Sequence, residues 1–75
     1  MNYSTNLLRH LRFTIGQNIH KQRVKKKIPL RKLAKLSGVP ENMLDYYDLG
    51  KSEIRLDELL KISCALETEV GEFIR

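Results

Sequence analysis

Basic side chains are concentrated in the first part of the chain. Residues 1–40 carry ten Lys and Arg and no Asp or Glu, whereas residues 41–75 carry four basic and nine acidic residues. The two parts have formal charges of +10 and −5, and the net charge is +5. A surface this positive attracts polyanions through long-range electrostatics. A Lys-rich face that is merely solvated would give the same count, so the charge alone leaves both interpretations open.

Residue types that carry catalysis or bind metals are sparse. Cys64 is the single cysteine, so no internal disulfide can form, and neither His10 nor His20 has a metal-binding partner at helical spacing. No nucleophile has a base at a recognisable spacing, and no glycine-rich loop is suited to a phosphate. The sequence therefore predicts a protein that is not an enzyme and that uses no cofactor.

The length of 75 residues allows one domain, which buries about 60 to 65% of its unfolded surface and is stabilised by packing alone. The chain contains no apolar run long enough for a signal core or a membrane span. We expect a soluble cytoplasmic protein without a membrane partner.

Hydrophobic residues recur at helical spacing in five segments. Gly38 and Gly50 each supply a positive φ that ends a helix, and Pro29 and Pro40 each favour the first turn of a new one. No strand pattern or internal repeat is present. We predict an all-α fold with helices over about 6–24, 29–37, 40–49 and 56–66, and a last short helix capped by Thr68.

The spacing also predicts which side chains face the core. Gly16 lies inside the first helix, where its use is the close approach of a neighbouring helix. Cys64 lies one position off its helix's packing face, so we expect it to be half-buried. The expected core positions are Leu8, Leu11, Ile15, Ile19, Leu33, Ala34, Leu36, Leu44, Tyr47, Leu59, Ile62, Ser63, Leu66, Val70, Phe73 and Ile74.

From Ile15 to Ile74 the chain resembles the Cro and repressor-like, or Xre-type, helix-turn-helix family, with no gap needed. Each matching piece is short, but together they keep the correct spacing over sixty residues. The pieces are Ile15-Gly16-Gln17-Asn18-Ile19, Arg23, Leu33-Ala34, Gly38-Val39, Leu44, Tyr47-Asp48, Gly50-Lys51, Leu56, Leu59, Ile62, Leu66, Val70 and Phe73-Ile74.

This resemblance implies a compact five-helix, lambda-repressor-like domain over residues 15–75, preceded by an extension of the first helix over residues 1–14. In the family the second helix of the domain crosses the DNA backbone and the third helix reads base edges in the major groove. Many relatives bind DNA as homodimers. By this resemblance the base contacts fall on Glu41, Asn42, Met43, Asp45 and Tyr46.

The leading hypothesis is a sequence-specific DNA-binding transcriptional regulator of bacterial or phage type, whose partner is double-stranded DNA. Arg23 and Asp48 match an Arg and an acidic residue that form a structural ion pair in relatives, although the acid there is usually Glu. Phosphate contacts are expected from Lys21, Lys25, Lys26, Lys27, Arg31, Lys32, Lys35 and Lys51.

Several positions depart from the family pattern and keep an alternative open. Leu30 replaces a frequent Gln, and Glu41 and Asp45 put acidic groups on the third helix, where phosphates would repel them. The exposed set of Asn42, Met43, Tyr46 and Leu49 can read DNA or form the centre of a protein interface. The alternative is an antitoxin-like or anti-repressor-like interaction module that uses the third helix for a protein partner.

Overall fold

The computed structural model describes residues 3–75, with side chains from Leu7 onward. It contains the helices α1 (Tyr3–Lys25), α2 (Leu30–Ser37), α3 (Glu41–Asp48) and α4 (Leu56–Ala65), and the 3-10 helix η1 (Val70–Phe73). No strand lies within the described residues. The all-α prediction is confirmed, and the five segments correspond to four α-helices and one 3-10 turn.

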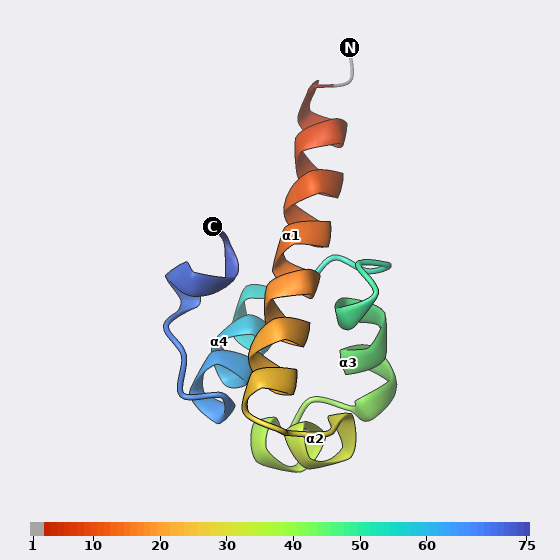
Figure 1. The fold of residues 1–75 in the computed structure, drawn as a ribbon. Helices are drawn as coiled ribbons and strands as arrows, with labels where there is room; N and C mark the ends of the chain where they lie inside the picture. Colours follow the sequence, from red (N-terminus) through yellow and green to blue (C-terminus); the bar gives the residue numbers. More distant parts are fainter. Residues whose placement is uncertain (1–2) are drawn as a thin grey trace.

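The helices surround one core (Figure 1). α1 runs the length of the molecule, α3 and α4 flank it, and α2 lies across its lower end. None of the helices within residues 3–75 is long and apolar enough to cross a membrane. The fully buried side chains include Ile19, Leu33, Val39, Leu44, Ile62, Leu66 and Phe73.

Glycine and proline set the helix boundaries as the sequence predicts. Gly38 adopts a φ of 78° after α2, and its N–H donates to the carbonyl oxygen of Ala34. Pro29 and Pro40 lie immediately before α2 and α3, and neither helix has an N-cap side-chain hydrogen bond. Ser37 assists the turn, because its hydroxyl donates to Leu33 O and accepts from the N–H of Val39.

Several details differ from the sequence-based expectations. Ile74 was expected in the core but is 51% exposed, whereas Phe73 beside it is fully buried. Leu36 is 54% exposed, whereas Leu30 packs against the core beside Leu33 and Ala34. Cys64 is exposed, since it lies too far around α4 from Leu59 and Ile62 to reach the core. Thr68 does not cap η1: its hydroxyl donates to Leu66 O, and Glu69 precedes the 3-10 turn.

A further difference concerns α1. Ile15 and Ile19 are buried as expected, but Leu8 and Leu11 on the same stripe are exposed. The helix continues beyond the body that its lower half helps to form (Figure 1).

Candidate nucleic-acid interface

α3 is held against the core by one face and leaves the other face free. Leu44 and Tyr47 are buried, whereas Glu41, Asn42, Asp45 and Tyr46 are exposed. Met43 is half-buried because it packs against the core. The structure therefore brings four of the five expected base-contact residues to the free surface and draws Met43 inward.

Close contact with α1 fixes the position of α3. A Cβ added at Gly16 would collide with the backbone carbonyl of Tyr47, and it would lie 3.3 Å from the backbone nitrogen of Gly50. The sequence-based interpretation of Gly16 as a point of close approach is confirmed. The absence of a side chain there lets the two helices touch at the level of their backbones.

A polar cluster joins α1 to the end of α3. Arg23 Nη2 donates to Asp48 Oδ2 at 2.7 Å, and Arg23 Nη1 donates to the carbonyl of Ile28 at 3.2 Å. His20 Nδ1 lies 3.0 Å from the same carboxylate oxygen. The Asp48 side chain is only 7% exposed. The shorter Asp side chain thus reaches Arg23 directly, and the pair ties α1, the α1–α2 connection and α3 together.

A second polar contact ties α3 to α4. The Tyr47 hydroxyl donates a hydrogen bond to Glu58 Oε1. The pKa of Tyr47 is raised to about 12, mainly because the phenol is buried and secondly because it contacts Glu58. Because the neutral phenol is favoured in this setting, Tyr47 serves as a hydrogen-bond donor that holds α3 from behind.

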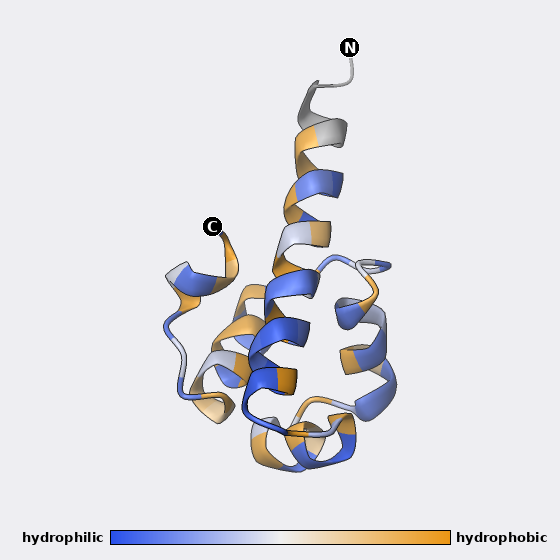
Figure 2. Cartoon of the chain, in the orientation of Figure 1, coloured by the Kyte–Doolittle hydropathy of each residue, from blue (hydrophilic) through white to orange (hydrophobic). Residues whose placement is uncertain are grey.

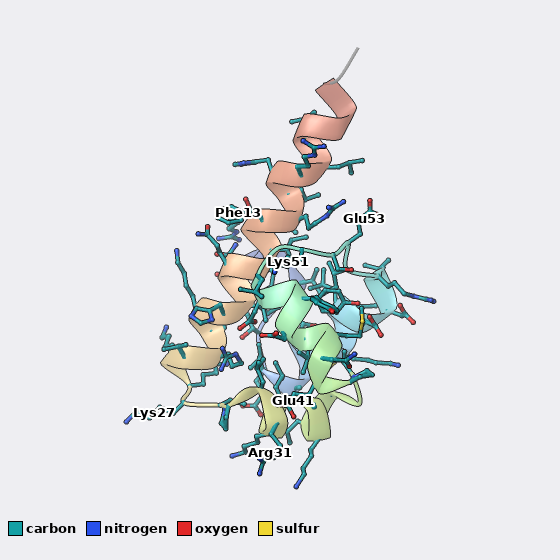
Figure 3. The ribbon with its side chains drawn as sticks, turned by 90° about the vertical axis from the view of Figure 1, so that its right-hand side faces the viewer. Phe13, Lys27, Arg31, Glu41, Lys51 and Glu53 are labelled. Carbon is teal, nitrogen blue, oxygen red and sulfur yellow. The ribbon has the colours of Figure 1, made fainter. Side chains whose placement is uncertain are left out.

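Basic side chains line a groove beside the N-terminal end of α3. The groove has a volume of about 510 Å³ and lies between α2 and Glu41. Figure 3, in which α3 faces the viewer, shows Lys27, Arg31 and Glu41 at one end of this face and Lys51 toward the other. The groove is lined by Pro29, Leu30, Arg31, Lys32, Lys35 and Glu41.

A second groove lies between α1 and α3. It has a volume of about 500 Å³, and it is lined by Gln17 and Lys21 of α1, by Asp45 of α3 and by Leu49 just after α3. Lys21, Lys25, Lys27 and Lys51 are all exposed. Cations therefore surround α3 at its α1 and α2 borders, while Asp45 and Glu41 put negative charge on the helix itself.

Lys26 is directed elsewhere. Its Nζ donates to the carbonyl of Leu66 and, at 3.2 Å, to the hydroxyl of Thr68. Both acceptors lie just beyond the C-terminal end of α4, where unpaired carbonyls and the helix dipole favour a cation. The structure therefore places the Lys26 ammonium at the end of α4, and the phosphate contact expected of this residue stays a prediction.

The comparisons with known proteins agree with this geometry. The family model described as helix-turn-helix matches residues 19–73, which is well over half of the chain. The chain belongs to the Xre-type helix-turn-helix family of DNA-binding regulators. The comparison with curated protein sequences gives no match.

A solved structure supports the same helix-turn-helix arrangement. The crystal structure of the restriction-modification controller protein C.AhdI from Aeromonas hydrophila superposes with a TM-score of 0.80 at 27% sequence identity. The superposition covers 83% of this chain and 94% of that chain.

Two residues of the helix-turn-helix site were not anticipated from the sequence. His20 lies at the surface, with its side chain 54% exposed, and it contacts Asp48. Its spacing of three from Arg23 could have placed both residues on one face of α1. Glu58 lies eleven residues from Tyr47, on another helix, and no local pattern indicates their contact.

Proposed function

We propose that this chain is a sequence-specific DNA-binding transcriptional regulator of the controller type, in which α3 enters the major groove. One observation carries the proposal: the free face of α3, with Asn42 and Tyr46 exposed, borders a groove lined by Arg31, Lys32 and Lys35. The major groove is about 12 Å wide and admits an α-helix. A helix that is supported from behind and flanked by cations is suited to enter it.

Each exposed residue of α3 has a distinct part in this proposal. Asn42 bonds an adenine edge, and Tyr46 reaches a base or a phosphate. Glu41 and Asp45 repel phosphates in general and accept from a cytosine amino group only where the sequence provides one. The helix therefore gives up part of its non-specific affinity for selectivity. Phosphate contacts come from Lys21, Lys25, Lys27, Arg31, Lys32, Lys35 and Lys51.

The similarity to C.AhdI, which is a restriction-modification controller protein by its description, supports a regulatory role for DNA binding here. The competing function is an interaction module. It is favoured by the exposure of Tyr46 (47%) and Leu49 (54%) beside acidic Asp45, a combination that also suits a protein partner.

The test begins with selection of bound duplexes from a random library. Binding of the selected site and of random duplex is then measured at one salt concentration for the parent and three variants. Asn42→Ala should weaken the selected site by about tenfold or more, and random duplex far less, since each specific base contact is worth about 1 to 3 kcal/mol.

Glu41→Gln should strengthen random duplex because it removes repulsion from phosphates. Glu67→Gln is the matched control: it removes the same charge from an exposed residue beyond the end of α4 and should change neither curve. If Asn42→Ala and Glu41→Gln are both silent, while Tyr46→Ala abolishes capture of a purified protein partner, the interaction-module function replaces the DNA-reading one.

A further inference from the structure

The groove between α1 and α3 has an apolar end. Phe13 and Leu49 both line the groove, and they are 52% and 54% exposed. They lie at one level of the molecule, since a Cβ added at Gly50, the residue after Leu49, would come within 3.3 Å of the Phe13 ring. Figure 3 places Phe13 toward the opposite end of this face from Glu41. The two side chains thus form an apolar wall that is accessible to a ligand.

Farther along, the same groove becomes polar. His20 lies seven residues beyond Phe13, which is about 10 Å along α1, and it contacts Asp48. Lys21 and Asp45 also line the groove, within one helical turn of His20 and Asp48 respectively, and both are exposed. Figure 2 shows mainly hydrophilic turns where α1 lies beside α3. The groove therefore offers an apolar surface and a polar surface to one ligand.

The charges that line the groove are balanced and separated. Lys21 lies on the α1 side and Asp45 on the α3 side, and neither forms an ion pair with any other residue that the structure describes. Arg23 and Asp48 compensate each other. Asp48 Oδ2 takes the contacts of both Arg23 and His20, whereas Oδ1 accepts no hydrogen bond from the described residues. A matching ligand therefore carries one positive and one negative group and no net charge.

We propose that this groove binds a free α-amino acid with a large apolar side chain. The ammonium group of the ligand lies against Asp45, its carboxylate pairs with Lys21, and its side chain covers Phe13 and Leu49. Charge-assisted hydrogen bonds are about twice as strong as neutral ones, and covering apolar surface adds to the affinity. A volume of about 500 Å³ is ample for such a molecule. The inference concerns a ligand bound in the absence of DNA and does not depend on the proposed function.

Titration of the isotope-labelled protein with L-phenylalanine, followed by nuclear magnetic resonance, tests the site. Amide signals along the groove should shift and saturate with a dissociation constant of about 1 mM, the strength expected of so small a ligand. Three matched probes each lack one part of the molecule: phenethylamine lacks the carboxylate, phenylpropionate lacks the ammonium group, and free glycine lacks the side chain. Each should bind more weakly by about fivefold or more.

Two variants of the groove locate the bound ligand. Asp45→Asn should weaken L-phenylalanine binding by about fivefold or more, because the ammonium group loses its partner. Asp57→Asn is the matched control, since it removes the same charge from an exposed aspartate of α4 outside the groove. Phe13→Ala should also weaken binding, whereas Val24→Ala, at an equally exposed apolar residue of α1 outside the groove, should not.

Circular dichroism should show that all four variants remain folded. The proposal would be overturned if L-phenylalanine gave no saturable shift, or if it shifted signals away from the groove only. It would also be overturned if phenethylamine or phenylpropionate bound as tightly as L-phenylalanine, or if Asp45→Asn had no more effect than Asp57→Asn.

Discussion

At the scale of single residues, the Arg23–Asp48 pair joins two helices through a largely buried contact. Both side chains are largely buried, at 14% and 7% exposed, and they join α1 to the end of α3. Asp48 Oδ1 and Arg23 Nε are buried without a hydrogen-bond partner among the described residues. The cluster is thus not fully satisfied, and its stability depends on both charges being present together.

We expect Asp48→Ala to lower the free energy of unfolding by about 3 kcal/mol, because it leaves the Arg23 guanidinium buried and unpaired. Urea denaturation measures the change. Glu72→Ala serves as the control: it breaks the Arg75–Glu72 pair, whose side chains are 76% and 46% exposed, and should cost less than about 1 kcal/mol. Equal urea midpoints for Asp48→Ala and the parent would show that the pair does not stabilise the fold.

Individual contacts were only partly predictable from the sequence. The Arg23 and Asp48 partners could be named because the family resemblance supplied them. The contact of Lys26 with the end of α4 could not be predicted, because nothing in the sequence distinguishes Lys26 from the lysines on either side of it. Met43 likewise lies at the edge of the helical wheel, where only the actual rotation of α3 decides between core and solvent.

At the scale of elements, the contact between α1 and α3 depends on Gly16. In an ordinary helix interior Ala is favoured over Gly by about 1 kcal/mol. Here the added methyl would meet the Tyr47 carbonyl, which belongs to a backbone that cannot rotate away. The sequence predicted a close approach at this residue, but only the fold identifies α3 as the helix that approaches.

Gly16→Ala should therefore destabilise the protein by about 1 to 3 kcal/mol, the usual range for overpacking, despite its better helix propensity. It should also reduce DNA affinity, because α3 must shift away from α1. Gly71→Ala is the control, since a Cβ at Gly71 meets nothing within 4 Å. Thermal unfolding and duplex binding measure both effects. A Gly16→Ala protein that melts above the parent would contradict the packing argument.

Helix boundaries were predicted to within a few residues, because Gly38, Pro29 and Pro40 act locally. The errors concern which side of α2 faces the core and how far α1 extends beyond the core. Leu36 was assigned inward by its helical spacing from Leu33, yet Leu30, Leu33 and Ala34 already fill the side of α2 that faces the core. The stripe on α1 could not reveal where the body ends, since periodicity is the same in the projecting part of α1 and in the core.

At the scale of the whole molecule, the charge asymmetry of the sequence becomes a spatial one. Cations border α3 at the edges of α1 and α2, while Asp57, Glu67 and Glu69 lie on or beyond α4. Electrostatic binding to DNA should therefore depend on where a charge lies, and not only on the net charge of +5. Lys26 and Arg31 allow this to be tested, because each change to Gln removes one positive charge from a different part of the surface.

Arg31→Gln should weaken binding to all duplexes by similar factors and reduce the slope of log affinity against log salt by about one, as expected for a phosphate contact. Lys26→Gln should leave that slope unchanged, because its Nζ is bonded to the end of α4. It should instead lower the free energy of unfolding by about 1 kcal/mol, the usual contribution of one hydrogen bond. Duplex titrations at four salt concentrations, together with urea denaturation of both variants, separate the two roles. Equal losses of slope would mean that binding follows net charge alone, and an unchanged slope for Arg31→Gln would remove α2 from the DNA-facing surface.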